Sequence, residues 1–299
     1  MVTLVVTSSW PRADDPIAGT FVRADARARA ARGERIIVAA PRGASEATSA
    51  PGITVVDVPC AELFGTPGAA LRARAHPLRI YGLLPWYRAI RRLVLEHTPD
   101  RVVAHWIVPG GLVAARAFDG PVEIVAHGAD VRLLEALPFG GRLVPRRANV
   151  TLRAVSEGLA ARLRALGTLD PIVEPMPLDD DAIERARQRP FTFTAGRPIR
   201  VVAGRLIAAK RIERAIDRTA ALGGTLVLVG DGPSRAALVA EAGQRRIPLL
   251  TTGAVRHEDA LRMLAGADEV IAPLSVGEGA PTVVREARAL GVKVTVLRS

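Results

Sequence analysis

The sequence predicts an α/β fold made of two doubly wound domains, each with a parallel sheet between layers of helices. Short β-branched, apolar runs alternate with stretches rich in alanine, arginine and leucine, which is the pattern of strands buried on both faces of a sheet. The pattern also occurs twice, because it restarts after a proline-rich stretch that contains Asp179-Asp180-Asp181. A chain of 299 residues is long enough for two domains that each bury a core.

The alternation places six strands in the first half of the chain and five in the second. The expected strands are residues 2–7, 35–39, 53–58, 101–105, 122–126 and 151–155, then 199–203, 225–229, 248–252, 269–272 and 292–297. We predict a first domain at residues 1–178, a linker at 179–198 and a second domain at 199–299. Ligands of such sheets bind beyond the carboxyl ends of the strands, so we expect a cleft between the two domains.

Composition narrows the class of protein. No apolar run approaches the roughly 20 residues of a membrane-spanning helix, and the opening run is too short for a signal peptide. A single cysteine, Cys60, excludes an internal disulfide and fits the cytoplasm. The formal net charge is +11, but the arginines are scattered between acidic residues, and no nucleic-acid-binding motif accompanies them. We therefore expect no nucleic-acid partner.

The most informative stretch runs from Glu278 to Glu286, where two carboxylates stand eight residues apart across Gly279 and Pro281. Proline suits the first turn of a helix, so Glu278 is expected before a helix and Glu286 within it. A helix N-terminus attracts an anion, and carboxylates accept hydrogen bonds from hydroxyl groups. The spacing therefore favours a ligand with a phosphate beside a sugar, such as a nucleotide sugar.

Two other segments of the second half suit the same ligand. Gly204-Arg205 follows a predicted strand, and Lys210 comes five residues after Arg205. The glycine allows close approach to the backbone, and both cations can bind a diphosphate; the alternative is an ordinary turn with solvated cations. The turn Gly230-Asp231-Gly232-Pro233 follows the next strand, either as a simple tight turn or as a loop that shapes a base pocket.

Taken in sequence order, these three segments resemble the second domain of GT-B fold glycosyltransferases, specifically glycosyltransferase family 4 (group 1). The resemblance implies that Arg205 and Lys210 bind the diphosphate of the sugar donor, Glu286 the ribose hydroxyls and Glu278 the transferred sugar. It implies no metal or other cofactor. The donor-binding residues that it indicates are Gly19, Gly204, Arg205, Lys210, Asp231, Gly232, Glu278, Gly279 and Glu286, and the catalytic ones are His127, Glu278, Arg205 and Lys210.

The implied activity is a retaining, hexosyltransferase-type transfer from a nucleotide-diphosphate sugar to a hydroxyl acceptor, which is a sugar or is lipid-linked. The setting it suggests is cell-envelope or exopolysaccharide biosynthesis. Family members normally continue after the strand that corresponds to residues 292–297, so we expect a second domain that is shortened at its C-terminus. For that reason a non-catalytic nucleotide-sugar-binding or scaffold protein stays as the alternative.

The first half of the chain adds weaker matches. Gly19 lies in a stretch that looks like the family's first βα loop, although a simple loop glycine is the alternative. The pair His127-Gly128 follows a predicted strand, and the resemblance places His127 against the donor sugar or the leaving phosphate. His105 has less support, and His76, His97 and His257 are expected on the surface. Ser156 and Glu157 suit a helix N-cap.

Residues 69–95 combine arginines with an aromatic and aliphatic stripe. This composition suits an anionic membrane surface, which would make the protein peripheral at the inner membrane face. The alternative is an amphipathic helix whose apolar side packs on the sheet.

Overall fold

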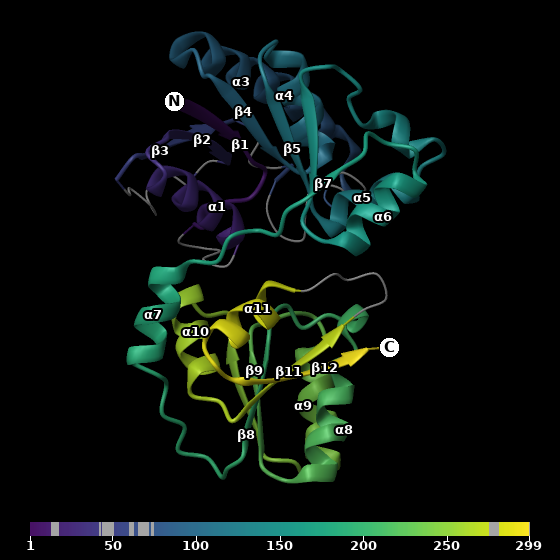
Figure 1. Ribbon diagram of the computed structural model, residues 1–299. Coiled ribbons are helices and arrows are strands. Elements are labelled where there is room, and N and C mark those ends of the chain that lie inside the picture. The colour runs from purple at the N-terminus through teal and green to yellow at the C-terminus, as the bar shows by residue number, and fades with distance from the viewer. Residues whose placement is uncertain are drawn as a thin grey trace. The chain divides into compact units, whose positions relative to one another are not determined.

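The computed structural model describes residues 1–12, 18–41, 43, 51–59, 63–64, 72, 75–274 and 281–298. The chain divides into two compact units, Met1–Pro177 and Leu178–Ser299. Each unit has a parallel sheet with helices on both faces (Figure 1). The predicted fold class of two doubly wound, Rossmann-like units is therefore confirmed.

Unit 1 contains a parallel sheet of order β3-β2-β1-β4-β5-β6-β7. The strand order reverses beside β1, as in doubly wound folds. Its strands are β1 (Val2–Val6), β2 (Arg35–Pro41), β3 (Ile53–Val58), β4 (Arg101–His105), β5 (Val122–Ala126), β6 (Val150–Ala154) and β7 (Ile172–Val173). Its helices are α1 (Thr20–Ala31), α3 (Leu83–His97), α4 (Leu112–Ala117), α5 (Gly128–Glu135) and α6 (Glu157–Ala165).

The sheet of unit 1 separates two apolar cores, because alternate strand residues point to opposite faces. On one face, Val22 of α1 packs with Val38 and Val103. On the other face, Trp86 and Ile90 of α3 join a larger cluster with residues of α4, α5 and α6. The strands are thus covered on both faces, which explains their nearly continuous apolar composition.

Unit 2 contains a parallel sheet of order β10-β9-β8-β11-β12. Its strands are β8 (Ile199–Ala203), β9 (Thr225–Val229), β10 (Leu249–Gly253), β11 (Glu269–Leu274) and β12 (Lys293–Arg298). Its helices are α7 (Asp180–Gln188), α8 (Glu213–Leu222), α9 (Arg235–Gln244), α10 (His257–Ala265) and α11 (Thr282–Ala289). The helices α7, α10 and α11 cover one face of the sheet and share a core, and α8 and α9 cover the other (Figure 1).

All eleven predicted strands are present, and their ends agree with the prediction to within two residues. Strand β7 was not predicted, because two exposed residues carry no detectable pattern. The expected linker at residues 179–198 is wrong in part, since α7 occupies Asp180–Gln188 and buries Ile183 against unit 2. Asp179 starts this helix, because its Oδ1 accepts a hydrogen bond from the Ala182 amide at 3.1 Å. The acidic run is thus a helix start.

The N-cap predicted at Ser156 is confirmed. Its Oγ accepts a hydrogen bond from the Leu159 amide at 3.3 Å, and Glu157 lies in the first turn of α6.

Candidate functional site

Two loops at the carboxyl ends of β8 and β9 are joined by backbone contacts. The Gly204 amide donates to the Val229 carbonyl, and the Leu206 amide donates to the Asp231 carbonyl, each at 2.9 Å. A side chain at Gly230 would place its Cβ 2.1 Å from the Gly204 carbonyl oxygen. Glycine is therefore required at Gly230 by contact as well as by its φ of 136°.

The same requirement holds at the next glycine of this loop. A Cβ at Gly232 would lie 2.4 Å from the Leu206 carbonyl oxygen, and the Ser234 amide donates to that oxygen at 3.0 Å. The segments Gly204–Leu206 and Gly230–Ser234, which the sequence presents as separate motifs, thus form one packed unit. We call these two segments together the glycine clasp.

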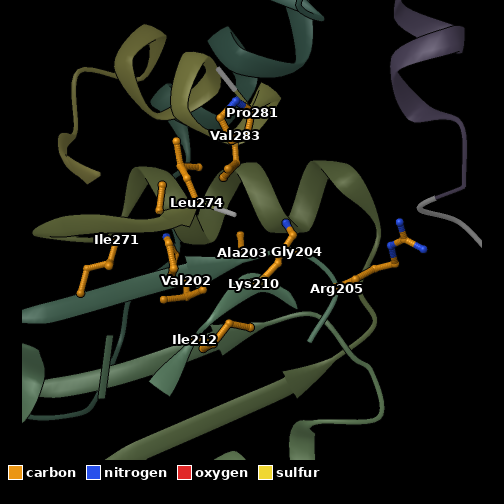
Figure 2. Close-up of a pocket in the computed structure, with 12 residues that line it drawn as sticks. Val202, Ala203, Gly204, Arg205, Lys210, Ile212, Ile271, Leu274, Pro281 and Val283 are labelled. Atoms are coloured by element: carbon orange, nitrogen blue, oxygen red, sulfur yellow. The ribbon is translucent and has the colours of Figure 1, made fainter. Parts of the chain in front are cut away.

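A pocket lies beside the glycine clasp, at the carboxyl ends of β8 and β11 (Figure 2). Gly204, Arg205 and Lys210 contribute to its lining from one side, and Pro281 and Val283 contribute from the start of α11. A Cβ at Gly204 would lie 3.0 Å from the Lys210 ammonium, so this cation lies over bare backbone. The structure therefore brings Gly204, Lys210 and the α11 N-terminus together.

The two cations of the predicted diphosphate site differ in orientation. The Lys210 side chain lies next to Gly204, whereas the Arg205 side chain is exposed and extends away from the pocket (Figure 2). Both remain within one loop, and a flexible exposed arginine can turn toward an anion. Their roles in binding a diphosphate stay predictions.

Asp231 supports the loop that carries it. Its Oδ1 accepts from the Gly232 amide at 2.8 Å, and its Oδ2 lies 3.4 Å from Arg235 Nη1. Arg235 also donates to the Thr251 hydroxyl of β10 at 3.1 Å. The carboxyl ends of β9 and β10 are thus tied together through α9.

Glu286 lies on α11 with 8% of its surface exposed. Its Oε1 is 2.7 Å from Nε2 of His257, the first residue of α10. The expectation that His257 lies on the surface is therefore wrong, because only 17% of its side chain is exposed and it contacts a predicted site residue. Glu278 and Gly279 lie outside the described residues.

In unit 1, Gly19 precedes α1 in the left-handed conformation, with φ of 63°. A Cβ there would lie 2.3 Å from the Ser9 carbonyl oxygen, so the loop after β1 packs directly on this residue. The glycine has a structural reason of its own, and its predicted role in binding the sugar donor stays a prediction.

His127 is enclosed by aromatic side chains at the carboxyl end of β5. Its Nε2 is 3.1 Å from His105 Nδ1, and the rings of Phe21 and Trp106 lie 4.9 and 5.0 Å from its centre. Burial lowers the pKa of His105 to about 4, and burial with the neighbouring His105 also lowers the pKa of His127. Both imidazoles are therefore neutral near pH 7, and one ring donates to the other.

Asp130 fixes the backbone around His127. It accepts hydrogen bonds from the amides of Ile107, His127 and Val131, at 2.8, 2.9 and 3.0 Å. Burial nevertheless raises the pKa of Asp130 to about 7. Because Asp130 stands three residues after the helix-start residue His127, the spacing of a capping box could have revealed this contact in the sequence.

A buried charge cluster lies behind His105. Asp25 of α1 accepts from Arg29 Nε at 2.8 Å and from Arg153 Nη1 at 3.2 Å, and its Oδ2 is 3.7 Å from His105 Nε2. Glu123 of β5 accepts from the same two arginines. Burial acts to raise the pKa of Asp25, but His105, Arg29 and Arg153 outweigh it and lower the pKa. Sequence reasoning missed this cluster because its members come from four elements.

Comparisons with known proteins bear on the fold. Neither protein-family models nor curated sequences match the chain. Among solved structures, sucrose-phosphate synthase from Thermosynechococcus elongatus matches with a TM-score of 0.71 at 16% identity, over 99% of this chain and 81% of that one. HepE from Anabaena in complex with UDP-glucose matches with a TM-score of 0.63 at 18% identity, over 99% and 80%. The chain has the GT-B fold.

A third neighbour is the catalytic domain of starch synthase IV from Arabidopsis thaliana, bound to ADP and acarbose. It has a TM-score of 0.63 at 14% identity, over 99% of this chain and 82% of that one. At such identities the likeness shows the fold alone. Membership of family 4 and a shortened second unit stay predictions.

No helix in the described parts of the chain is long and apolar enough to span a membrane.

Proposed function

We propose that the chain is a glycosyltransferase that moves a sugar from a nucleotide-diphosphate sugar to a hydroxyl acceptor. The observation that carries the proposal is the pocket where Gly204, Lys210 and the start of α11 meet. Bare backbone allows close approach of a ligand, an ammonium supplies charge, and a helix N-terminus favours an anion. These three features together suit the diphosphate of a sugar donor.

In this proposal the cations act on the leaving group. As the bond to the sugar breaks, negative charge grows on the departing diphosphate, and Lys210 with Arg205 stabilises that charge. Glu286 binds the ribose hydroxyls, Glu278 binds the transferred sugar, and His127 acts as a neutral hydrogen-bonding group. We infer a retaining, hexosyltransferase-type reaction on a sugar or lipid-linked acceptor, in cell-envelope or exopolysaccharide biosynthesis.

The first test is a calorimetric titration with UDP, GDP and ADP. HepE was solved with UDP-glucose and starch synthase IV with ADP, so uridine and adenine nucleotides are tried first. Lys210→Ala is expected to weaken binding about 10- to 100-fold, the range for one charge-assisted hydrogen bond. Lys293→Ala is the matched control, because Lys293 is the only other lysine and begins β12 at the opposite end of the strands. It should leave the dissociation constant unchanged.

A nucleotide-release assay with the matching sugar donors and a panel of acceptors then tests turnover. Release that depends on Lys210 supports the transferase. Binding without release would favour the non-catalytic nucleotide-sugar-binding or scaffold protein. No binding of any of the three nucleotides would contradict both.

We also propose that unit 1 contacts an anionic membrane surface, through a patch at residues 78–92. This segment has both exposed apolar side chains and exposed cations: Leu78, Ile80, Tyr81 and Leu84, and Arg88, Arg91 and Arg92. Trp86 and Ile90, which belong to the stripe predicted from sequence, are instead buried in the core. The apolar side chains that could enter the headgroup region therefore come mainly from the turn before α3.

Liposome flotation tests this contact and the proposed location at the inner face of a membrane. Vesicles with one third phosphatidylglycerol should carry the protein upward, and neutral phosphatidylcholine vesicles should not. The double change Leu78→Ser and Tyr81→Ser should weaken flotation, because both side chains are at least three-quarters exposed. Equal behaviour on the two vesicle types at moderate salt would contradict the proposal.

A further inference from the structure

The contact between His257 and Glu286 joins two helices of unit 2. His257 begins α10, directly after the loop that leaves β10, and Glu286 lies within α11. Nε2 and Oε1 are 2.7 Å apart, which is short for a nitrogen–oxygen pair and typical of a charge-assisted hydrogen bond. With side chains only 17% and 11% exposed, the two groups are held largely away from solvent.

The chemistry of the pair fixes the direction of this hydrogen bond. An ionised carboxylate can only accept, so Nε2 of His257 carries the hydrogen and donates it to Oε1 of Glu286. The other carboxylate oxygen, Oε2, has no hydrogen-bond partner among the residues that the structure describes. One oxygen of Glu286 is therefore held by His257, and the second has no such contact among the described residues.

The place of Glu286 in the fold makes this orientation important. Glu286 is in α11, whose N-terminal residues line the pocket with Gly204 and Lys210. The carboxylate of Glu286 lies at the end of a side chain with three rotatable bonds. A ligand that orders this side chain on binding therefore costs conformational entropy. A hydrogen bond that already holds one oxygen lowers that cost, because the group is ordered before the ligand arrives.

We propose that His257 is a positioning residue, which holds Oε1 of Glu286 so that Oε2 can accept a hydrogen bond from a ribose hydroxyl of the bound nucleotide. The inference rests on the proposed function, since it assigns a partner to a residue of that site. His257 does not touch the ligand in this arrangement. It acts through Glu286, and the contact also ties the start of α10 to α11.

The test compares variants in titrations with UDP, GDP and ADP and follows whichever binds the wild type. His257→Ala is expected to raise the dissociation constant about tenfold, the effect of one lost hydrogen bond to a charged group. His257→Gln keeps an N–H near the position of Nε2 and should stay within about threefold of the wild type. His97→Ala, at the end of α3 in unit 1, is the matched control and should have no effect.

A ribose-specific readout separates positioning from a general loss of structure. The wild type should bind the nucleotide more tightly than its 2′-deoxy or its 3′-deoxy form, and His257→Ala should reduce that preference to less than about twofold. In a Glu286→Gln background, His257→Ala should change the dissociation constant by less than about twofold, because both changes remove the same interaction. Variants are compared only where circular dichroism shows a folded protein. If His257→Ala does not fold, His257→Phe replaces it, because phenylalanine keeps a ring but has no N–H to donate.

The titrations distinguish a missing role of His257 from a missing nucleotide site. If the wild type binds a nucleotide, and His257→Ala binds it equally well with the same ribose preference, the positioning role is refuted and the glycosyltransferase proposal stands. If the affinity falls but the ribose preference is unchanged, His257 has only a structural role. If the wild type binds none of the three nucleotides, the proposed function itself fails.

Discussion

Asp25→Ala should destabilise unit 1 strongly, because it leaves two buried cations short of a partner. The side chains of Asp25, Arg29 and Arg153 are 4%, 4% and 3% exposed, so the two guanidinium groups are shielded from bulk water. Glu123, at 19% side-chain exposure, would remain as the shared anion of both arginines. The substitution therefore breaks the charge balance of the cluster without removing its positive groups.

Removal of one partner from a buried ion pair costs about 3–5 kcal/mol of unfolding free energy. Unit 1 spans Met1–Pro177, and a domain of that size loses about 2–4 °C in Tm per kcal/mol. The expected fall in Tm is therefore roughly 6–20 °C. Since neighbouring charges lower the pKa of Asp25, its contribution is present at neutral pH and is lost only as the pH falls below about 4.

Tryptophan fluorescence during thermal unfolding measures this effect for unit 1 alone. All three tryptophans of the chain, Trp10, Trp86 and Trp106, lie in this unit. Asp119→Ala is the control, because that carboxylate is 95% exposed and pairs with Arg147 at 3.0 Å at the surface. It should cost less than about 1 kcal/mol. If Asp25→Ala lowers the Tm no more than Asp119→Ala does, the buried cluster does not contribute as the geometry indicates.

Two further predictions concern pH and backbone packing. Burial lowers the pKa of His105 to about 4, against about 6.5 in an unfolded chain. Between these two pH values the unfolded state binds more protons than the folded state, so the free energy of unfolding falls as the pH drops from about 6.5 to 4. Urea unfolding at pH 7 and pH 4.5 measures how much unfolding free energy is lost between these two pH values. His105→Gln should lose less than the wild type, by up to about 3 kcal/mol. Equal losses in the two proteins would count against a buried neutral imidazole. Gly230→Ala should destabilise unit 2 by at least about 1–3 kcal/mol, followed by circular dichroism, because its Cβ would lie 2.1 Å from a carbonyl oxygen at a positive φ. Gly243→Ala, with nothing within 4 Å of the added Cβ, is the control and should be neutral or stabilising.

The sheets could be predicted because their strands are buried on both faces. Strand β9, Thr225–Val229, is fully buried and reads as one apolar run between turn residues. Strand β7 has only two exposed residues, so no such signal exists there. Helix α7 was missed because prolines and acidic residues surround it, although Ile183 and Ala186 at helical spacing mark its buried side.

The candidate site could be predicted only in part, since sequence order does not give contacts across elements. The glycines at positions 204, 230 and 232 stand out as turn residues, but their common packing follows from strands β8 and β9 lying side by side. His257 and Glu286 are 29 residues apart and meet only because α10 packs against α11. The enclosure of His127 likewise depends on Phe21, which comes from α1.

The glycine clasp limits how such a site can change in evolution or in the laboratory. Carbonyl oxygens of Gly204 and Leu206 already fill the space where side chains at Gly230 and Gly232 would begin, so neither loop can vary without the other. Libraries aimed at a different nucleotide should therefore keep these glycines constant. Diversity is better placed outside the clasp, for example at the exposed Ala254 in the loop between β10 and α10.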